Sequence, residues 1–554
     1  MRRLLNLTIV GFAMFLASGC VSNKAERLPE RNFSPLFEGM GSHSRQVTTV
    51  STLGQRYFDQ GLNWYYAFNH DEAIRSFTDA AKLDPNCPMA WWGIAIANGP
   101  HINNPEVPPD RAAAAWTALQ KAIACSDRGS TIEQELIFAL KARYADPQPS
   151  DRSSLDKAYA DEMKKLWLKF PNDQDIGTLY AEALMDLSPW DLWTQDKQPK
   201  SGTEEIIEVL ETVLSMDVNN PGANHLYIHA VEASDNPQRA NAAADRLRRL
   251  MPGSGHMIHM PSHIDVLAGR WELAAKQNEQ AMEIDAAYRK LSPRQGFYQI
   301  YMSHNSHMLS FASMMEGRHA IALSSAEAAI GDIPAKTLKE QAAFLDPYMG
   351  VVYDVHKRFG RWDAMLSEEK PASFLPITTT MWHFHRAVAF AAKGDVKGAE
   401  RERSAFLAAR DNVPADAKMA INKASAIFDI AEHFLNGEIS FRKGEFEESI
   451  AHLRKAIEIE DGLLYMEPPE WVQPTRHTLG AVLLTAGRYR EAEKVYREDL
   501  AKWPENGWSL YGLSRALAQG GDEKEAASVL ARFHRAWKRS DSPIASSCLC
   551  IPKT

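Results

Sequence analysis

Histidines are concentrated in one stretch of the chain, and their spacing repeats. Seven of the 18 histidines lie within residues 224–307. His225 and His229 form an i, i+4 pair, His259 and His263 form another, and each member of the second pair follows its counterpart by 34 residues. Residues four apart share one face of an α-helix, so each pair is predicted to present two imidazoles on the same side of a helix.

Side chains of these types bind transition metals. Imidazole is a common ligand of zinc, copper and iron, and neighbouring helices can hold several nitrogens about 2.0–2.1 Å from one ion. His225, His229 and Glu232 could supply two nitrogens and one oxygen, an open ligand set in which Glu232 is a candidate ligand or general base. The predicted metal ligands are His225, His229, Glu232, His256, His259, His263, His304 and His307.

The same residues also fit a groove lined by polar side chains that binds no metal. The sequence contains no H-E-x-x-H, no C-x-x-C pair, no Walker A loop and no G-x-S-x-G elbow. No reaction is therefore indicated by a known motif, and Glu232 is the one candidate catalytic residue.

Helices must position these histidines, and the chain carries a repeating helical pattern. Small and aromatic residues recur at fixed spacing, because two antiparallel helices approach closely only where small residues lie at the crossing and aromatic rings fill the space beside it. One copy consists of Gly61, Trp64, Ala73, Phe77, Ala80 and Pro85; others contain Gly437, Gly444, Phe446 and Ala456, and Gly480, Ala492, Tyr496 and Pro504. The pattern resembles the tetratricopeptide repeat family over residues 50–540.

This resemblance implies an all-α fold, a solenoid of roughly ten antiparallel helix pairs wound as a right-handed superhelix. In the family, the first helix of each pair lines a concave groove that binds peptides or partner proteins. Alignment places the histidines there, on helices expected at 221–234 and 256–269 and on a third that carries His304 and His307. The segments 68–73, 224–232, 259–263 and 467–471 resemble a bacterial lipoprotein subgroup of the family with a histidine-rich groove.

The first residues are typical of a bacterial lipoprotein signal. Arg2 and Arg3 precede an apolar run from Leu4 to Leu16, and small residues lead to Cys20. We expect a signal peptide at 1–19, lipidation (palmitate) at Cys20, a linker through residue 49, and an outer-membrane anchor facing the periplasm. No later stretch reaches the roughly 18 apolar residues of a spanning helix.

Cysteine usage leaves disulfide connectivity open. Cys87 and Cys125 could pair in an oxidising compartment, since each lies near the end of a predicted helix. A bridge between Cys548 and Cys550 would be strained, and we expect both in a loose C-terminal tail at 541–554.

Two turn-rich inserts interrupt the repeats, at 188–202 and 467–476. They either cap a binding face or fill gaps between irregular repeats. The net charge of −9 and the pI near 6.1 give no basic surface for nucleic acid. We expect a lipid-anchored envelope protein that binds a partner protein or peptide in its groove. The alternatives are a metal-binding protein or metal-dependent enzyme with zinc, copper or iron at the histidines, and a metal-free solute binder.

Overall fold

The computed structural model describes residues 33–293, 296–331 and 333–551. Residues Met1–Ser34 form one unit and Pro35–Thr554 form another, and every helix and strand named below belongs to the second unit. The expected signal peptide and Cys20 lie outside the described residues. Among the described helices, none combines the length and apolarity that a membrane crossing requires.

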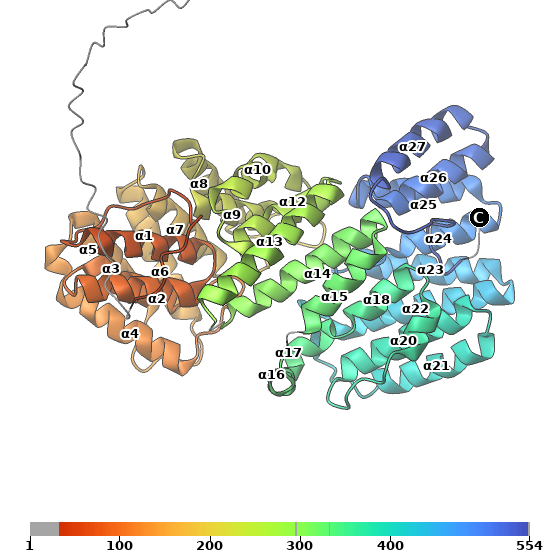
Figure 1. Ribbon diagram of the computed structural model, residues 1–554, viewed down its shortest axis with the longest axis horizontal. Helices are drawn as coiled ribbons and strands as arrows, with labels where there is room; N and C mark the ends of the chain where they lie inside the picture. Colours follow the sequence, from red (N-terminus) through yellow and green to blue (C-terminus); the bar gives the residue numbers. More distant parts are fainter. Residues whose placement is uncertain (1–32, 294–295, 332, 552–554) are drawn as a thin grey trace, which may run out of the picture. The chain divides into compact units, whose positions relative to one another are not determined.

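Helices make up nearly all of the regular secondary structure in the described part of the chain (Figure 1). Its first half contains α1 (Thr52–Tyr66), α2 (His70–Leu83), α3 (Pro88–Ala97), α4 (Pro109–Ala124), η1 (Ser126–Arg128), α5 (Thr131–Leu140), η2 (Lys141–Arg143), α6 (Ser153–Lys169), α7 (Gln174–Met185), α8 (Thr203–Met216), α9 (Pro221–Val231), η3 (Pro237–Ala240), α10 (Asn241–Leu250), α11 (Gly255–His259), α12 (Pro261–Leu267) and α13 (Trp271–Leu291).

The second half contains α14 (Tyr298–Glu316), α15 (His319–Gly331), α16 (Ala335–Glu340), α17 (Ala342–Leu345), η4 (Asp346–Tyr348), α18 (Val351–Arg358), α19 (Trp362–Ser367), α20 (Pro376–Ala392), α21 (Val396–Arg410), α22 (Ala424–Lys443), α23 (Phe446–Asp461), α24 (Thr475–Thr485), α25 (Tyr489–Lys502), α26 (Gly507–Gly520) and α27 (Glu523–Ala536). Two short strands, β1 (Lys418–Met419) and β2 (Asn422–Lys423), pair antiparallel.

Consecutive helices pack as pairs, and the residue pattern explains why. α1 packs on α2, α2 packs on α3, and α1 also contacts α3. The ring of Phe77 on α2 fills the space beside Gly61 on α1 and Gly93 on α3, where an added Cβ would come within 2.7 Å and 2.4 Å of the ring. The glycines therefore permit the close helix approach predicted from the sequence.

The same packing of an aromatic ring between two helix glycines occurs near the end of the array. A Cβ at Gly480 on α24 or at Gly512 on α26 would come within 2.3 Å or 2.2 Å of the ring of Tyr496, which lies on α25 between them. An all-α array of tetratricopeptide-like helix pairs is thus confirmed, and its helices run from Thr52 to Ala536.

The expected linker is wrong for residues 36–49, because the segment after Pro35 packs on the helices. The Nη1 of Arg45 donates to Asp173 at 2.8 Å, and the His43 ring lies 2.9 Å from Asp175. The backbone N–H of Phe37 donates to the buried side chain of Gln60. These contacts tie the segment before α1 to α1 and to the start of α7.

Both cysteine expectations differ from the structure. Cys87 and Cys125 are free and buried, and the Cys125 thiol donates to the carbonyls of Lys121 and Ala122, so it points back along its own helix. Cys548 and Cys550 are bonded to each other. The C-terminal tail is not loose, because its residues 546–551 pack against the core formed by α20 to α27.

The two inserts are irregular segments, as expected. Residues 186–202 connect α7 to α8, and residues 462–474 connect α23 to α24. They contact each other where the side-chain amide of Gln195 donates to the carbonyl of Gly462 at 2.8 Å. The Trp193 indole donates to the carbonyl of Ala230 on α9 at 2.8 Å, which fixes the first insert against the histidine-bearing helix.

Candidate metal centre

Helix α9 carries the first two histidines of the cluster. It begins at Pro221, after Asn220, whose side chain accepts the backbone N–H of Ala223 at 2.8 Å. The His225 Nδ1 lies 2.7 Å from the carbonyl oxygen of Tyr66. Because a carbonyl only accepts, this Nδ1 carries the proton and the Nε2 is left with a free lone pair.

His229 is held in the same way by a carboxylate. Its Nδ1 lies 2.8 Å from Oε1 of Glu232, the residue that follows the last turn of α9. Its Nε2 is buried and has no hydrogen-bond partner in the part of the chain that the structure describes. Glu232 therefore lies behind the His229 ring as an orienting group, the arrangement found around histidines that bind metals through the other nitrogen.

Helices α11 and α12 carry the second set. Ser254 caps α11 by accepting the N–H of Met257. Pro261 starts α12 and lacks an N–H for the preceding turn, so the predicted single helix at 256–269 is divided into two short ones. The pairing of His259 with His263 survives this break, because Met260 keeps a helical backbone.

Fixed acceptors also orient these rings. The His259 Nδ1 donates to the Asn278 Oδ1 at 2.7 Å, and the amide of Asn278 is itself oriented by its bond to the carbonyl of Ala274. The His263 Nδ1 lies 2.7 Å from Glu232 and 2.8 Å from Glu467. Both rings consequently turn their Nε2 atoms away from these partners.

The Nε2 atoms converge. Those of His259 and His263 are 2.8 Å apart, and those of His225 and His256 are 3.2 Å apart. Three sets of three residues in this cluster have potential ligand atoms within 4.8 Å of one another: a first triad of His225, His229 and His256, a second triad of His259, His263 and His304, and a mixed set of His229, Glu232 and His263. Helices α9, α11, α12 and α14 bring them together, since α9 contacts α12 and α11 contacts α14.

Burial and charge keep most of these rings neutral. His225 and His259 are 0% exposed, and His256 and His263 are 2% exposed. Burial, together with the neighbouring imidazoles, lowers the pKa of His225, His256, His259 and His304 well below the usual value. Neutral imidazoles are the form that binds metals.

The carboxylates create an exception at His263. Burial acts to lower the pKa of His263, but the carboxylates of Glu467 and Glu232 outweigh it and raise that pKa. Burial acts to raise the pKa of Glu232, and the imidazoles of His229 and His263 lower it below its usual value. The centre therefore contains one carboxylate that is kept ionised between two histidines.

One predicted ligand, His307, lies outside both triads, and one neighbour of the centre, Glu467, was not predicted as a site residue. His307 does not join either triad: one turn beyond His304 on α14, its ring lies 6.2 Å from that of Tyr348. Glu467 was noticed as part of an insert but not as a site residue, because it is about 200 positions away from His263. No sequence signal could have paired them.

His70 and His101 lie next to the cluster but are separated from it by an aromatic ring. The Phe68 ring centroid lies 4.6 Å from that of His101 on one side and 4.4 Å from that of His225 on another. Phe68 also contacts the rings of His229 and His256. It therefore forms an apolar wall of the first triad.

A cavity of about 550 Å³ opens beside the centre. His229 and Glu232 form part of its wall, and residues of both inserts, including Trp190, Gln195 and Glu470, form much of the rest. Of the two alternatives for the inserts, capping a binding site is the one that this lining favours. The volume is in the range of small-molecule sites.

Comparison with known proteins identifies the repeat. Two sequence profiles described as Tetratricopeptide repeat match residues 434–462, on α22 and α23, and residues 483–533, from the end of α24 to α27. The chain contains tetratricopeptide repeats in these two segments. The expected family is thereby confirmed, whereas the lipoprotein subgroup stays a prediction. No protein with a curated description matches the chain.

Solved structures resemble this tetratricopeptide-repeat protein only loosely. The human IFIT1 dimer with m7Gppp-AAAA is 14% identical, covers 88% of this chain and 91% of its own, and has a TM-score of 0.32. The APC/C hetero-tetramer Cut9-Hcn1 is 12% identical, covers 88% and 74%, and has a TM-score of 0.29. Yeast Tom70 is 10% identical, covers 87% and 93%, and has a TM-score of 0.27. Similarity at this level does not bear on function.

Proposed function

We propose that this tetratricopeptide-repeat protein binds transition-metal ions in its histidine cluster. The direction of the ring nitrogens carries the proposal: fixed acceptors hold the Nδ1 atoms of His225, His229, His259 and His263. The Nε2 atoms face one another in two pairs, His225 with His256 and His259 with His263. Two nitrogens bound to one tetrahedral ion lie about 3.4 Å apart. The 3.2 Å between the Nε2 atoms of His225 and His256 is close to that separation.

Burial is the reason to prefer a metal over a metal-free polar groove. A groove that binds a peptide through histidines must expose them, whereas His225 and His259 are fully buried. Where both facing Nε2 atoms are unprotonated their lone pairs repel, and a cation between them removes that repulsion. Nitrogen-rich sites of this kind suit zinc, copper or iron. The two triads provide adjacent positions for two ions.

Elemental analysis tests this proposal. The full-length chain, purified without chelator, is expected to contain about one or two equivalents of a transition metal. A variant with His225→Ala, His229→Ala, His259→Ala and His263→Ala is expected to contain none while its circular dichroism stays helical. The matched control carries alanine in place of His319, His383 and His534, which lie outside the cluster. This control is expected to keep the metal. Absence of metal from the parent, even after reconstitution, contradicts the proposal.

Binding of a partner protein or peptide is a second candidate function. Tetratricopeptide repeats are scaffolds for protein–protein interaction. The loop-lined cavity beside Glu232 is the observation that favours it, because an apolar or aromatic side chain of a partner could occupy that volume. A photo-crosslinking residue at Lys197, on the first insert, should capture such a partner. One at Lys157, which is exposed on α6, should not. Equal capture at both positions contradicts binding at the cavity.

We further propose that the chain is anchored by lipid at Cys20, in the outer membrane and facing the periplasm. The signal-like residues before Cys20 support this proposal. Detergent phase partitioning tests it: the parent should enter the detergent phase and a Cys20→Ser variant should stay in the aqueous phase. A parent that stays aqueous contradicts the anchor.

A further inference from the structure

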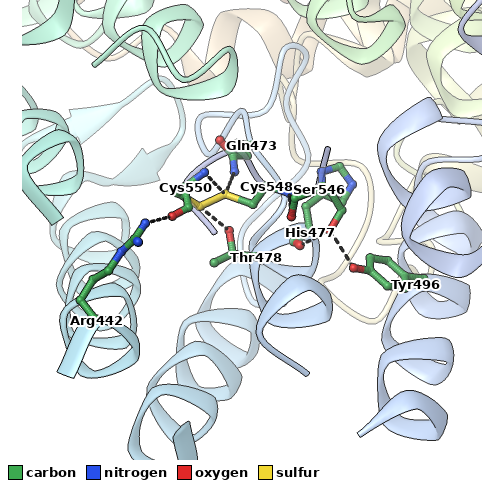
Figure 2. The surroundings of a disulfide bond; sticks show 9 residues. Arg442, Gln473, His477, Thr478, Tyr496, Ser546, Cys548 and Cys550 are labelled. Carbon is green, nitrogen blue, oxygen red and sulfur yellow. Dashed lines mark hydrogen bonds between the residues drawn. A yellow bond between two sulfur atoms is a disulfide. The ribbon is translucent and has the colours of Figure 1, made fainter. Parts of the chain in front are cut away.

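The last described residues enter the core beside α22 and α24 (Figure 2). Cys548 and Cys550 are 2% and 0% exposed. The segment is fixed by groups on three helices: Ser547 donates to the backbone carbonyl of His477, the Tyr496 hydroxyl bonds to Ser547, and the Arg442 guanidinium donates to the carbonyl of Cys550. The cysteine pair therefore has a fixed position, and it is far in sequence from the histidines.

A buried carboxylate faces this pair without any partner. Glu438 on α22 is 0% exposed, and neither of its carboxylate oxygens has a hydrogen-bond partner among the described residues. One of its oxygens and the sulfurs of Cys548 and Cys550 lie within 4.8 Å of one another. A buried carboxylate without hydrogen bonds is costly in its ionised form, and a cation bound beside it would remove that cost.

The ligand types indicate which cation fits. Thiolate sulfur selects thiophilic ions, and two thiolates with a carboxylate form a set that zinc accepts. Sulfurs bound to one zinc ion at about 2.3 Å lie about 3.8 Å apart, so the ion requires the reduced pair. Bonded sulfurs lie too close together to act as two ligands.

The surroundings stabilise thiolates. The Cys548 sulfur accepts from the Gln473 side-chain amide and from the N–H of Cys550, both at 3.3 Å. The Thr478 hydroxyl lies 3.7 Å from the Cys550 sulfur. The cationic side chains of Lys357 and Arg442 act on Glu438 through their charge. Two thiolates, a carboxylate and a divalent ion leave one net negative charge, which these cations offset.

We propose that the reduced Cys548 and Cys550 bind a zinc-like thiophilic ion with Glu438, and that formation of their disulfide releases it. A dithiol reductant supplies two electrons and two protons to the disulfide and becomes a disulfide itself. The two thiol protons pass to solvent when the ion binds. In the reverse direction, an oxidising disulfide takes two electrons from the two thiolates and two protons from solvent. Its own sulfur–sulfur bond breaks to give a dithiol, the bond between Cys548 and Cys550 forms, and the ion leaves.

Cobalt(II) is a probe that separates this site from the histidines, because only sulfur ligands give an intense thiolate-to-cobalt charge-transfer band. The experiment uses the full chain with Cys20→Ser, Cys87→Ser and Cys125→Ser, so that the pair holds the only thiols. The pair is reduced with a trialkylphosphine, which becomes the phosphine oxide and is removed before anaerobic titration. We expect a band that saturates near one equivalent, disappears when zinc is added, and is absent from the oxidised chain.

Substitution of Glu438 tests whether its carboxylate binds the ion together with the two thiols. Glu438→Gln should weaken cobalt binding at the thiols by at least about tenfold. The control Glu432→Gln, on the same helix but paired with Arg410, should leave it unchanged. A reduced chain with two reactive thiols and no charge-transfer band overturns the proposal. So does equal affinity in the Glu438→Gln variant. The histidine-cluster proposal is unaffected by either result, since its metal gives no sulfur band.

Discussion

His259 and His263 face each other through their Nε2 atoms at 2.8 Å, one turn apart across the break at Pro261. Two neutral rings whose Nδ1 atoms are both protonated would place lone pair against lone pair. Two arrangements remove this repulsion: an ion bound by both nitrogens, or a proton on the His263 Nε2 donated to the His259 Nε2. If an ion is bound by both nitrogens, removing the metal lowers the stability of the protein. If a proton is shared between them, a chelator has no effect on stability.

Removing metal is therefore expected to lower the stability of the parent. An ion present at about 100 times its dissociation constant adds about 2.7 kcal/mol to the free energy of unfolding. Thermal unfolding with and without a strong chelator measures this difference, and adding back zinc should restore the melting temperature. The four-histidine variant should show no response to chelator. A chelator-insensitive parent would favour the proton-shared arrangement.

Asn278 is expected to tune the affinity of the second triad without binding the ion. Its Oδ1 orients His259 at 2.7 Å, and Asn278→Ala removes that acceptor. Loss of such an orienting group typically lowers metal affinity about 10- to 100-fold. Competition with a chromogenic chelator measures the change. Asn412→Ala, at an exposed site after α21, is the control. Unchanged affinity in both variants would show that His259 is not a ligand.

Access to the centre is expected to pass through the loop-lined cavity. Ala233 lies in its wall beside Glu232, and Ala233→Trp should fill part of the volume. In copper-loaded protein, azide that reaches the metal gives a charge-transfer band, and the tryptophan variant should lose it while retaining copper. Ala113→Trp, on the exposed face of α4, should behave as the parent does. Azide binding in both variants would place the route elsewhere.

The segment before α1 is expected to loosen as pH rises. Burial acts to lower the pKa of His43, but its hydrogen bond and charge interaction with Asp175 raise that pKa above the usual 6.5. A raised folded pKa gives stabilisation that is complete below the unfolded pKa and is lost as pH rises through the folded value. Asp175 adds no slope there, because its pKa is lowered to about 2.

Hydrogen exchange of residues 35–50 at about pH 6 and about pH 9, corrected for the intrinsic rate, measures this effect. His43→Gln should remove the difference between the two pH values. His534→Gln, at an exposed position on α27, should retain it. Exchange that is equally slow at both pH values in the parent would mean that the ion pair contributes nothing.

Close helix packing predicts the effect of one added methyl group. Gly93→Ala puts a Cβ within 2.4 Å of the Phe77 ring, which also lies against Gly61 and has no free space to move into. Overpacking of this kind costs about 1–3 kcal/mol. Urea unfolding measures it. Gly331→Ala, whose Cβ meets nothing within 4 Å, should be neutral, and equal midpoints for both variants would contradict the packing argument.

The sequence alone determined the helical repeat and the convergence of most histidines. Gly61, Phe77, Gly480 and Tyr496 are short-range signals, because helix pairing is encoded within about 34 residues. The pairs at His225 and His259 were visible for the same reason: one repeat carries the next helix to the same position. Periodicity thus predicts which side chains share a face.

Only the tertiary structure decided which ring nitrogens are free and which distant groups join the centre. Glu467 reaches His263 from an insert, Tyr66 orients His225 from another repeat, and Cys548 and Cys550 enter the core beside Glu438. Inserts and tails have no period, so their final positions depend on packing against the whole array. For that reason the expected loose tail was wrong.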